Sequence, residues 1–175
     1  MKRSFVAILS AVCWILFALL SATRPLHAQS LSEVEREHPD ISTFVTLTNE
    51  TLGSELSTIA ARHETITVFA PDNSAFDALP HAVLDRLHTN HTLLKDVLLN
   101  HILRGNITAH DLLGEGLIEA KTLYDNSSVL INATNTSITV DGNKVITPDV
   151  FFDLGVIHII DGVLVPTNLR HELLG

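Results

Sequence analysis

Histidine is the side chain in this sequence best suited to hold a metal ion or to transfer a proton near neutral pH, and the 175-residue chain has 10 of them. His88 and His91 are three residues apart, but the Thr-Asn pair between them favours a break in the helix that would bring them to one face. His101, His110 and His158 are widely separated, and the chain contains no His-x-His or His-Glu-x-x-His motif. These patterns predict solvated or structural histidines, no metal site and no cofactor.

The residues that would carry hydrolytic chemistry are also missing from the sequence. There is no Gly-x-Ser-x-Gly motif, and the single cysteine, Cys13, lies in an apolar N-terminal stretch. Asp72 and Asp77 are five residues apart, so a helix would not turn them toward each other as an acid–base pair. The Gly114–Gly116 segment lacks the preceding strand and the lysine of a phosphate-binding loop. The sequence therefore predicts a protein that is not an enzyme, and a hydrolase of acyl or glycosidic bonds is the weakest alternative.

The sequence contains more N-glycosylation motifs than chance predicts. Six Asn-x-Ser/Thr motifs occur, where about two would be expected by chance from the numbers of Asn, Ser and Thr. Their asparagines are Asn49, Asn90, Asn106, Asn126, Asn132 and Asn135. We interpret them as N-glycosylation acceptors of a secreted protein, although Asn132 and Asn135 are too close for both to be modified together. The alternative is a Thr- and Asn-rich β segment that matches the motif by accident.

The N-terminus has the pattern of a secretory signal peptide. Lys2 and Arg3 precede an apolar run from Phe5 to Leu20, and polar residues follow near Ala28, so we expect cleavage after Ala28. An uncleaved signal anchor is the alternative, because the apolar run is somewhat long. After cleavage we expect no membrane span, and the C-terminus is too short and polar for the apolar tail of a glycolipid anchor.

Removal of residues 1–28 leaves a markedly acidic chain. Three of the 11 Lys and Arg lie in that segment and none of the 20 Asp and Glu does, so 8 cations remain against 20 anions, a net charge of −12 with His neutral. Such a charge repels phosphate backbones, which excludes nucleic acid as a partner. The sole cysteine is lost as well, so the secreted protein must be stable without a disulfide.

The rest of the chain divides into a helical half and a β half. Residues 29–39 form a polar lead-in, and Asp40 is suited to cap the first helix. Apolar residues at helical spacing then predict helices over residues 40–47, 53–63, 72–79, 83–87, 93–98 and 108–113, interrupted by a strand over residues 65–70 that Pro71 ends. Later strands are predicted over residues 123–124, 129–133, 138–140, 145–147, 155–160 and 163–166. Asp141-Gly142 predicts a type I′ hairpin turn. This order indicates one α+β domain with an antiparallel or mixed sheet.

Two separated blocks of the sequence resemble the signature blocks of the fasciclin (FAS1) domain family. They are Thr67–Phe76 (TVFAPDNSAF) and Val156–Pro166 (VIHIIDGVLVP), and the segment ending at Leu103 (LLNHIL) resembles the family's central tyrosine–histidine segment. The resemblance implies a FAS1 fold over residues 40–168, with N-terminal helices packed against a mostly antiparallel β-sheet wedge, and a C-terminal tail at 169–175.

The resemblance also implies a secreted binding module of the cell wall or matrix that mediates cell adhesion. The partners would be cell-surface or matrix proteins or polysaccharides, and a homodimer would supply the two sites that bridging requires. Its candidate contact residues are Asn100, which replaces the family tyrosine, His101, Pro148, Asp149 and His158. Pro148-Asp149 is also a good turn former, and His158 is also explained as a structural histidine bonded to a carbonyl or carboxylate. The alternative function is an extracellular carrier of a small ligand or metal, with a pocket between the helices and the sheet.

Overall fold

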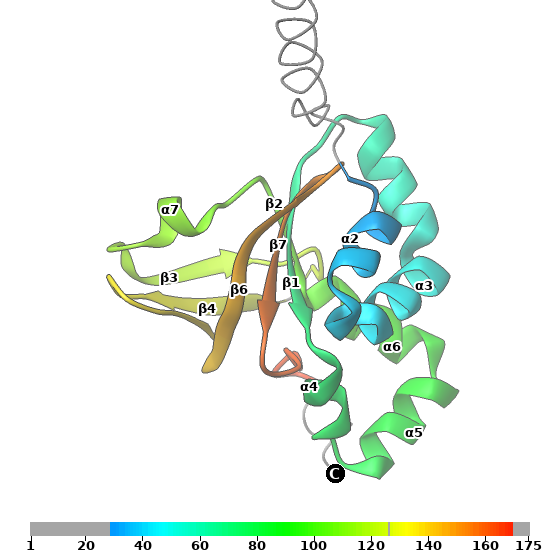
Figure 1. The fold of residues 1–175 in the computed structure, drawn as a ribbon. Helices are drawn as coiled ribbons and strands as arrows, with labels where there is room; N and C mark the ends of the chain where they lie inside the picture. Colours follow the sequence, from blue (N-terminus) through cyan, green and yellow to red (C-terminus); the bar gives the residue numbers. More distant parts are fainter. Residues whose placement is uncertain (1–28, 126, 170–175) are drawn as a thin grey trace, which may run out of the picture.

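The computed structural model of the protein describes residues 29–125 and 127–169. The predicted signal peptide, Asn126 and most of the predicted tail lie outside the described residues. Within them the chain folds as helices packed against one side of a sheet, while part of the sheet extends away from the helices (Figure 1). The predicted α+β class is confirmed.

The lead-in is not an unstructured spacer, because it contains helix α2 (Leu31–Glu37). Ser30 and Glu33 form a capping box at its start, and the Ser30 side chain accepts a hydrogen bond from the Glu33 N–H. Val34 of α2 is completely buried. The backbone N–H of Asp153 also donates to the carbonyl of Gln29 at 2.9 Å. Part of the predicted polar lead-in is therefore built into the fold.

The predicted first two helices are one continuous helix, α3 (Ser42–Ala61), preceded by the 3-10 turn η1 (Pro39–Ile41). Asp40 lies inside that turn, so the expectation that it caps the helix is wrong. The cap comes from a distant residue instead, since the Asn73 Oδ1 accepts a hydrogen bond from the Thr43 N–H at 3.1 Å. Gly53 does not interrupt the helix.

Four further helices follow, and most of their boundaries agree with the sequence pattern. Asp72 caps α4 (Asn73–Asp77), and Thr108 forms a capping box with Asp111 at α7 (Ala109–Leu112). The predicted break between His88 and His91 is confirmed by the separation of α5 (His81–Thr89) from α6 (His91–Asn100). At this break the Asn90 Oδ1 caps α6 by accepting from two backbone N–H groups.

The sheet has seven strands in the order β2-β1-β7-β6-β5-β4-β3, and only the β1–β7 pair is parallel. The strands are β1 (Ile66–Pro71), β2 (Ile102–Arg104), β3 (Gly116–Lys121), β4 (Ser128–Ala133), β5 (Ile138–Val140), β6 (Asn143–Phe152) and β7 (Gly155–Ile160). The predicted hairpin turn between β5 and β6 is confirmed by positive φ at both Asp141 and Gly142.

Four strand predictions need correction. Sequence reasoning missed β2 and β3, and it placed a strand at Leu123–Tyr124 where the structure has none. Instead a single bridge joins Thr122 to Leu103 of β2, and it brings the two edges of the sheet together at one point. Residues 163–166 after β7 are not a strand either, although Val163, Leu164 and Val165 pack against the core.

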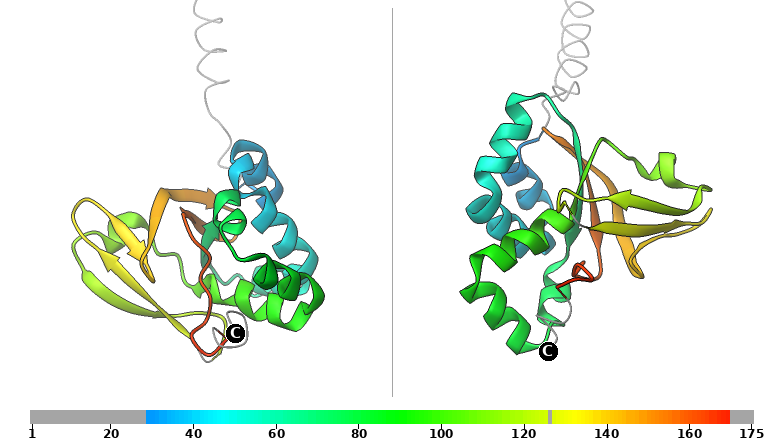
Figure 2. Two further views of the ribbon diagram at one scale, coloured as in Figure 1. Left: turned by 90° about the horizontal axis from the view of Figure 1, so that it is seen from below. Right: turned by 180° about the vertical axis from the view of Figure 1, so that it is seen from behind.

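Two hydrophobic clusters fill the fold. The larger lies between the helices and the β1–β7 side of the sheet, and it includes Phe44, Leu98 and Ile159. The smaller lies where the extension formed by β3, β4 and β5 folds toward β7, and it includes Phe69, Ile131 and Ile160. Figure 2 shows α2, α3, α5 and α6 on one side of β1 and β7, and this extension together with α7 on the other side. Among the described residues, no helix combines the length and apolar character needed to cross a membrane.

Candidate functional site

The structure divides the five candidate contact residues into two groups. Asn100, His101 and His158 are buried, with at most 1% of their surface exposed. Pro148 is exposed and Asp149 is partly buried. The side chains of the first three are therefore out of reach of a partner that docks on the folded domain.

Asn100 and His101 hold the segment that follows β7. The Asn100 Nδ2 donates to the Leu164 carbonyl at 3.0 Å. The Leu164 N–H donates to Nε2 of His101 at 2.9 Å, so the ring proton is on Nδ1, which donates to the Val97 carbonyl at 2.8 Å. Burial lowers the pKa of His101 to about 4, which keeps the ring neutral near pH 7. These two residues are structural anchors, and no local pattern in the sequence distinguishes this role from binding.

His158 joins β7 to two neighbouring segments. Its Nδ1 accepts from the Asp149 N–H at 3.2 Å, and its Nε2 donates to the Ile107 carbonyl at 2.9 Å. The ring stacks on Phe69 with centroids 5.5 Å apart. Burial lowers the pKa of His158, although its bond to Ile107 and the charge of Asp149 oppose that shift. The geometry shows a bonded structural histidine, which is one of the two roles expected from the sequence.

Pro148 and Asp149 do not form a chain reversal, so the turn interpretation is wrong. They lie inside β6, where the pairing with β7 shifts register between Thr147 and Val150, and Asp149 has a φ of 57°. The Oδ1 of Asp149 accepts from the Ala109 N–H at 2.8 Å, at the first residue of α7. This carboxylate therefore ties the bulge to α7.

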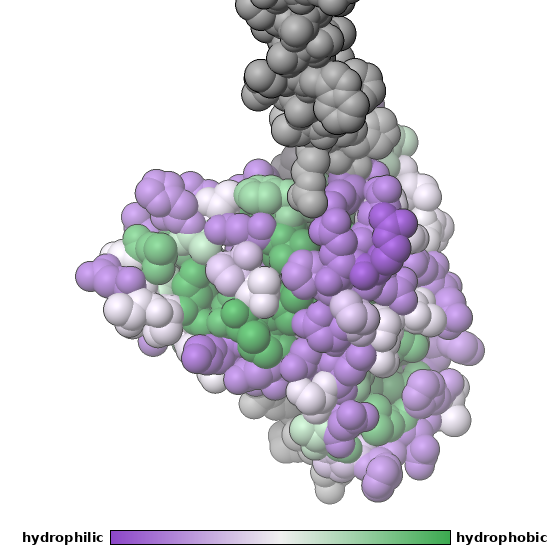
Figure 3. All heavy atoms as spheres, in the orientation of Figure 1, coloured by the Kyte–Doolittle hydropathy of each residue, from purple (hydrophilic) through white to green (hydrophobic). Residues whose placement is uncertain are grey.

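The bulge separates two exposed apolar side chains that sequence reasoning did not select as contacts. Ile146 precedes it with 50% of its surface exposed, and Phe151 follows it with 57% exposed. We call Ile146, Pro148 and Phe151 the β6 segment. In Figure 3, hydrophobic surface gathers over the strands, left of centre, whereas the surface over α2 is hydrophilic. A strand pattern alone could not identify the segment, because the register shift breaks the alternation from which exposure is inferred.

A second apolar surface lies on the outer face of β3 and β4. Leu117 and Leu130 are exposed there by 64% and 45%. Leu117 lies opposite Asn132 in the antiparallel register, and opposite residues point to the same side of a sheet. This outer face therefore carries a predicted glycosylation asparagine beside its leucines.

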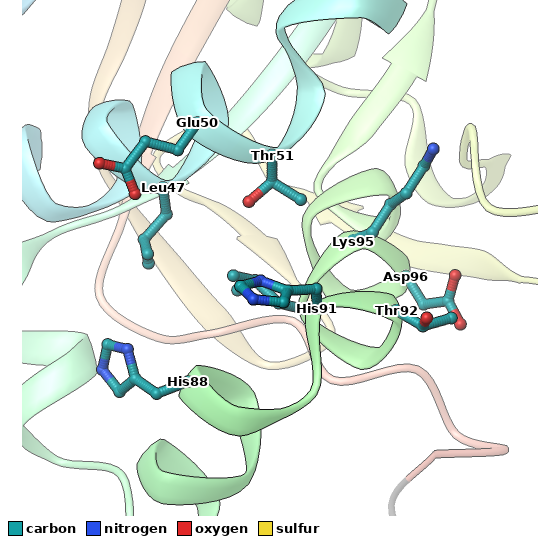
Figure 4. A pocket seen from close by; sticks show the side chains of 9 residues that line it. Leu47, Glu50, Thr51, His88, His91, Thr92, Lys95 and Asp96 are labelled. Carbon is teal, nitrogen blue, oxygen red and sulfur yellow. The ribbon is translucent and has the colours of Figure 1, made fainter.

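The helices form a groove of about 710 Å³ that is lined mainly by polar side chains (Figure 4). Leu47, Glu50 and Thr51 extend from α3, and the remaining lining residues come from the end of α5 and from α6, namely His88, His91, Thr92, Leu94, Lys95 and Asp96. Within residues 29–125 and 127–169, no group of three or more His, Cys, Asp or Glu is arranged to hold a metal ion.

Lys95 also forms an ion pair with Glu55 of α3, and this hydrogen bond is the main cause that lowers the pKa of Glu55. The pair links α6 to α3 beside the groove. It leaves this cation engaged within the protein rather than free to attract an anionic ligand.

Comparison with known proteins agrees with the fold. The profile of the Fasciclin domain matches residues 39–166. Transforming growth factor-beta-induced protein ig-h3 of Sus scrofa is 29% identical over 81% of this chain, although the chain spans only 20% of that protein. Immunogenic protein MPB70 of Mycobacterium bovis is 25% identical, over 86% of this chain and 78% of its own length.

A solved structure provides an independent comparison of the backbone. The FAS1 domain pair from the insect cell adhesion molecule Fasciclin I superposes with a TM-score of 0.61 at 23% identity, and the match covers 75% of this chain and 47% of that one. It shows the same fold. Because the family profile and the structural match agree with the two signature blocks, we conclude that the chain belongs to the fasciclin domain family.

Proposed function

We propose that this protein is a secreted, non-enzymatic binding module that attaches to a cell-surface or matrix protein through the β6 segment. The observation that carries the proposal is the exposure of Ile146 and Phe151 on either side of a bulge whose polar groups are already bonded inside the protein. Large exposed apolar side chains provide contact area that a partner can cover.

Support for the class of function comes from the family. A fold relative is a cell adhesion molecule by its description, and adhesion is the role that we extend to this chain. Adhesion between two surfaces requires a second site, which a homodimer or a glycan would supply. We place the protein outside the cell, in the wall or matrix.

The chemistry of the partner follows from charge and surface. The segment 29–175 has a net charge of −12, which disfavours strongly anionic polymers and favours a neutral or basic protein surface. The β6 segment would insert apolar side chains into a complementary pocket on that surface. Pro148 limits the flexibility of the exposed strand, and Asp149 holds its shape from within.

The carrier alternative receives less support from the geometry. Where the helices face β1 and β7, the described residues fill the interface with core side chains such as Ile59, Val68 and Leu98. Seven of the nine residues that line the groove between the helices are polar.

The test is saturable retention of the secreted, folded protein on intact cells and on isolated matrix fractions. We expect Phe151→Ser to weaken binding by at least tenfold, since a central apolar contact carries about 1.4 kcal/mol or more. The matched control is Leu130→Ser, which removes a similarly exposed apolar side chain from β4.

Equal losses in both variants would show non-specific adhesion, and unchanged binding of Phe151→Ser would contradict the proposed contact. Asp149→Ala is unsuitable as the primary test, because it also removes the bond to Ala109 and would perturb the bulge.

A further inference from the structure

We infer that N-linked glycans attach at Asn49, at Asn90, at Asn106 and at one of Asn132 and Asn135. The inference rests on how the ten asparagines use the side-chain nitrogen that glycosylation modifies. The four asparagines outside the Asn-x-Ser/Thr motif all donate from Nδ2 within the fold. These are Asn73 to Pro39 and Ser42, Asn100 to Leu164, Asn143 to Val140, and Asn168 to Tyr124.

The motif asparagines behave in the opposite way. All five that lie within the described residues are exposed, and among those residues none of the five donates a hydrogen bond from Nδ2. Among the described asparagines, those outside a motif all donate from Nδ2 and those inside a motif do not. The alternative of a Thr- and Asn-rich β segment does not explain this difference, because three of the motif asparagines lie elsewhere, on α3, at the α5–α6 break and in the β2–α7 loop.

The separation has a direct chemical reason. Transfer forms a bond from Nδ2 to the anomeric carbon of the sugar and breaks the bond from that carbon to the diphosphate of a lipid-linked oligosaccharide donor. The nitrogen loses one proton and the lipid diphosphate departs as the leaving group. A glycosylated nitrogen keeps one N–H, but a sugar on a nitrogen that donates inside the fold would have to fit into the packing around it or displace its hydrogen-bond partner.

The Asn90 side chain can cap a helix and carry a sugar at the same time. Its Oδ1 caps α6 by accepting from the Thr92 and Leu93 N–H groups, both at 3.1 Å. Glycosylation leaves that oxygen in place. The cap and the sugar are therefore compatible at one residue.

The positions of the glycosylation sites indicate which surfaces of the domain the sugars would cover. Glu50 and Thr51 line the α3 wall of the helix groove and directly follow Asn49 in the sequence, and His88 and His91, which line the opposite wall, flank Asn90 in the sequence (Figure 4). A glycan at Asn132 would stand on the β3–β4 outer face beside Leu117. Sugars would then flank the groove and cover the outer leucines, while β6 carries no motif asparagine. Only this last consequence, an uncovered β6 segment for protein contact, rests on the proposed function.

The test is expression of the full chain with its own N-terminus in a eukaryotic secretory host. Peptide-N-glycosidase in ¹⁸O-water converts each glycosylated asparagine to a labelled aspartate, which peptide mass spectrometry locates. We expect label at Asn49, at Asn90, at Asn106 and at one of Asn132 and Asn135. Folded, secreted protein without label at these positions would overturn the inference, whatever the binding assay shows.

Two variants distinguish the loss of a glycan from the loss of a helix cap. Thr92→Ala removes the glycosylation motif but keeps the Asn90 cap of α6, whereas Asn90→Gln removes both the motif and the cap. Each variant should lose one glycan. Only Asn90→Gln should clearly lower the melting temperature. Asn143→Gln, outside any motif, should leave the glycan number unchanged. Loss of a glycan in Asn143→Gln, or none in Thr92→Ala, would contradict the assignment.

Discussion

At the scale of single residues, the two buried histidines act as neutral connectors. In each ring one nitrogen donates to a carbonyl and the other accepts from a backbone N–H, so all polar atoms of the side chain are satisfied. A second proton on His101 would face the Leu164 N–H, which also donates. Protonation therefore opposes the native arrangement of the segment after β7.

This predicts a loss of stability in mild acid. The pKa of His101 is about 4 in the fold and 6.5 in the unfolded chain, so the unfolded state binds more protons between these values. The stabilisation is complete above pH 6.5 and is lost as the pH falls toward 4, by about 3 kcal/mol for His101. Burial lowers the pKa of His158 as well, so its contribution has the same sign. Urea unfolding at several pH values measures the effect.

His101→Gln is the control, because an amide can offer both a donor and an acceptor but does not titrate in this range. We expect a shallower decline of the unfolding free energy with acid than in the wild-type protein. Equal slopes in the two proteins would show that His101 does not carry the pH dependence.

At the scale of elements, the parallel β1–β7 pair depends on a close backbone approach at Gly155. Gly155 lies opposite Ile66 with a φ of 146°, and a Cβ at this position would be 2.0 Å from the Ile66 carbonyl oxygen. The Ile66 N–H also donates to the Leu154 carbonyl at 2.8 Å. The start of β7 thus requires a residue without a side chain.

Gly155→Ala should therefore destabilise the protein by more than about 3 kcal/mol, since strain and lost pairing add. Gly53→Ala is the matched control, because Gly53 is in α3 and a Cβ there meets nothing within 4 Å. It should stabilise the protein by about 0.5 to 1 kcal/mol. Chemical denaturation of both variants checks the prediction, and a Gly155→Ala variant of wild-type stability would refute it.

At the scale of the whole molecule, the fold joins segments from both ends of the domain. Helix α2 packs on α3 and near β6, and Gln29 accepts a bond from Asp153 at the far end of β6. The bridge between Leu103 and Thr122 draws the free edges of β2 and β3 together. The bridge reduces exposed strand edge and joins the extended part of the sheet to β2, and the Gln29 bond ties the N-terminal segment to the end of β6.

If α2 is an integral part of the domain, Val34→Ala should lower the unfolding free energy by about 1 to 3 kcal/mol, because the buried valine loses two methyl groups and leaves a cavity. Ser32→Ala, at an exposed position of the same helix, should change it by less than about 0.5 kcal/mol. A negligible effect of Val34→Ala would show that α2 does not contribute to the stability of the domain.

The sequence by itself determined the features whose causes lie within a few residues. The β1 strand and its end at Pro71, the cap of α4 by Asp72, the break before α6 and the turn at Asp141-Gly142 depend on local propensity and neighbouring side chains. The two signature blocks also determined the family.

Only the tertiary structure decided the burial of Asn100 and His101, the bulge at Asp149 and the cap of α3 by Asn73. The hydrogen bonds behind these features join residues 30 to 64 positions apart, from Thr43 with Asn73 to Asn100 with Leu164. Chain folding brings such partners together, and local propensity carries no information about them. A polar residue near a signature block could therefore be recognised from the sequence, but whether it faces solvent or the core depended on the packing of the whole domain.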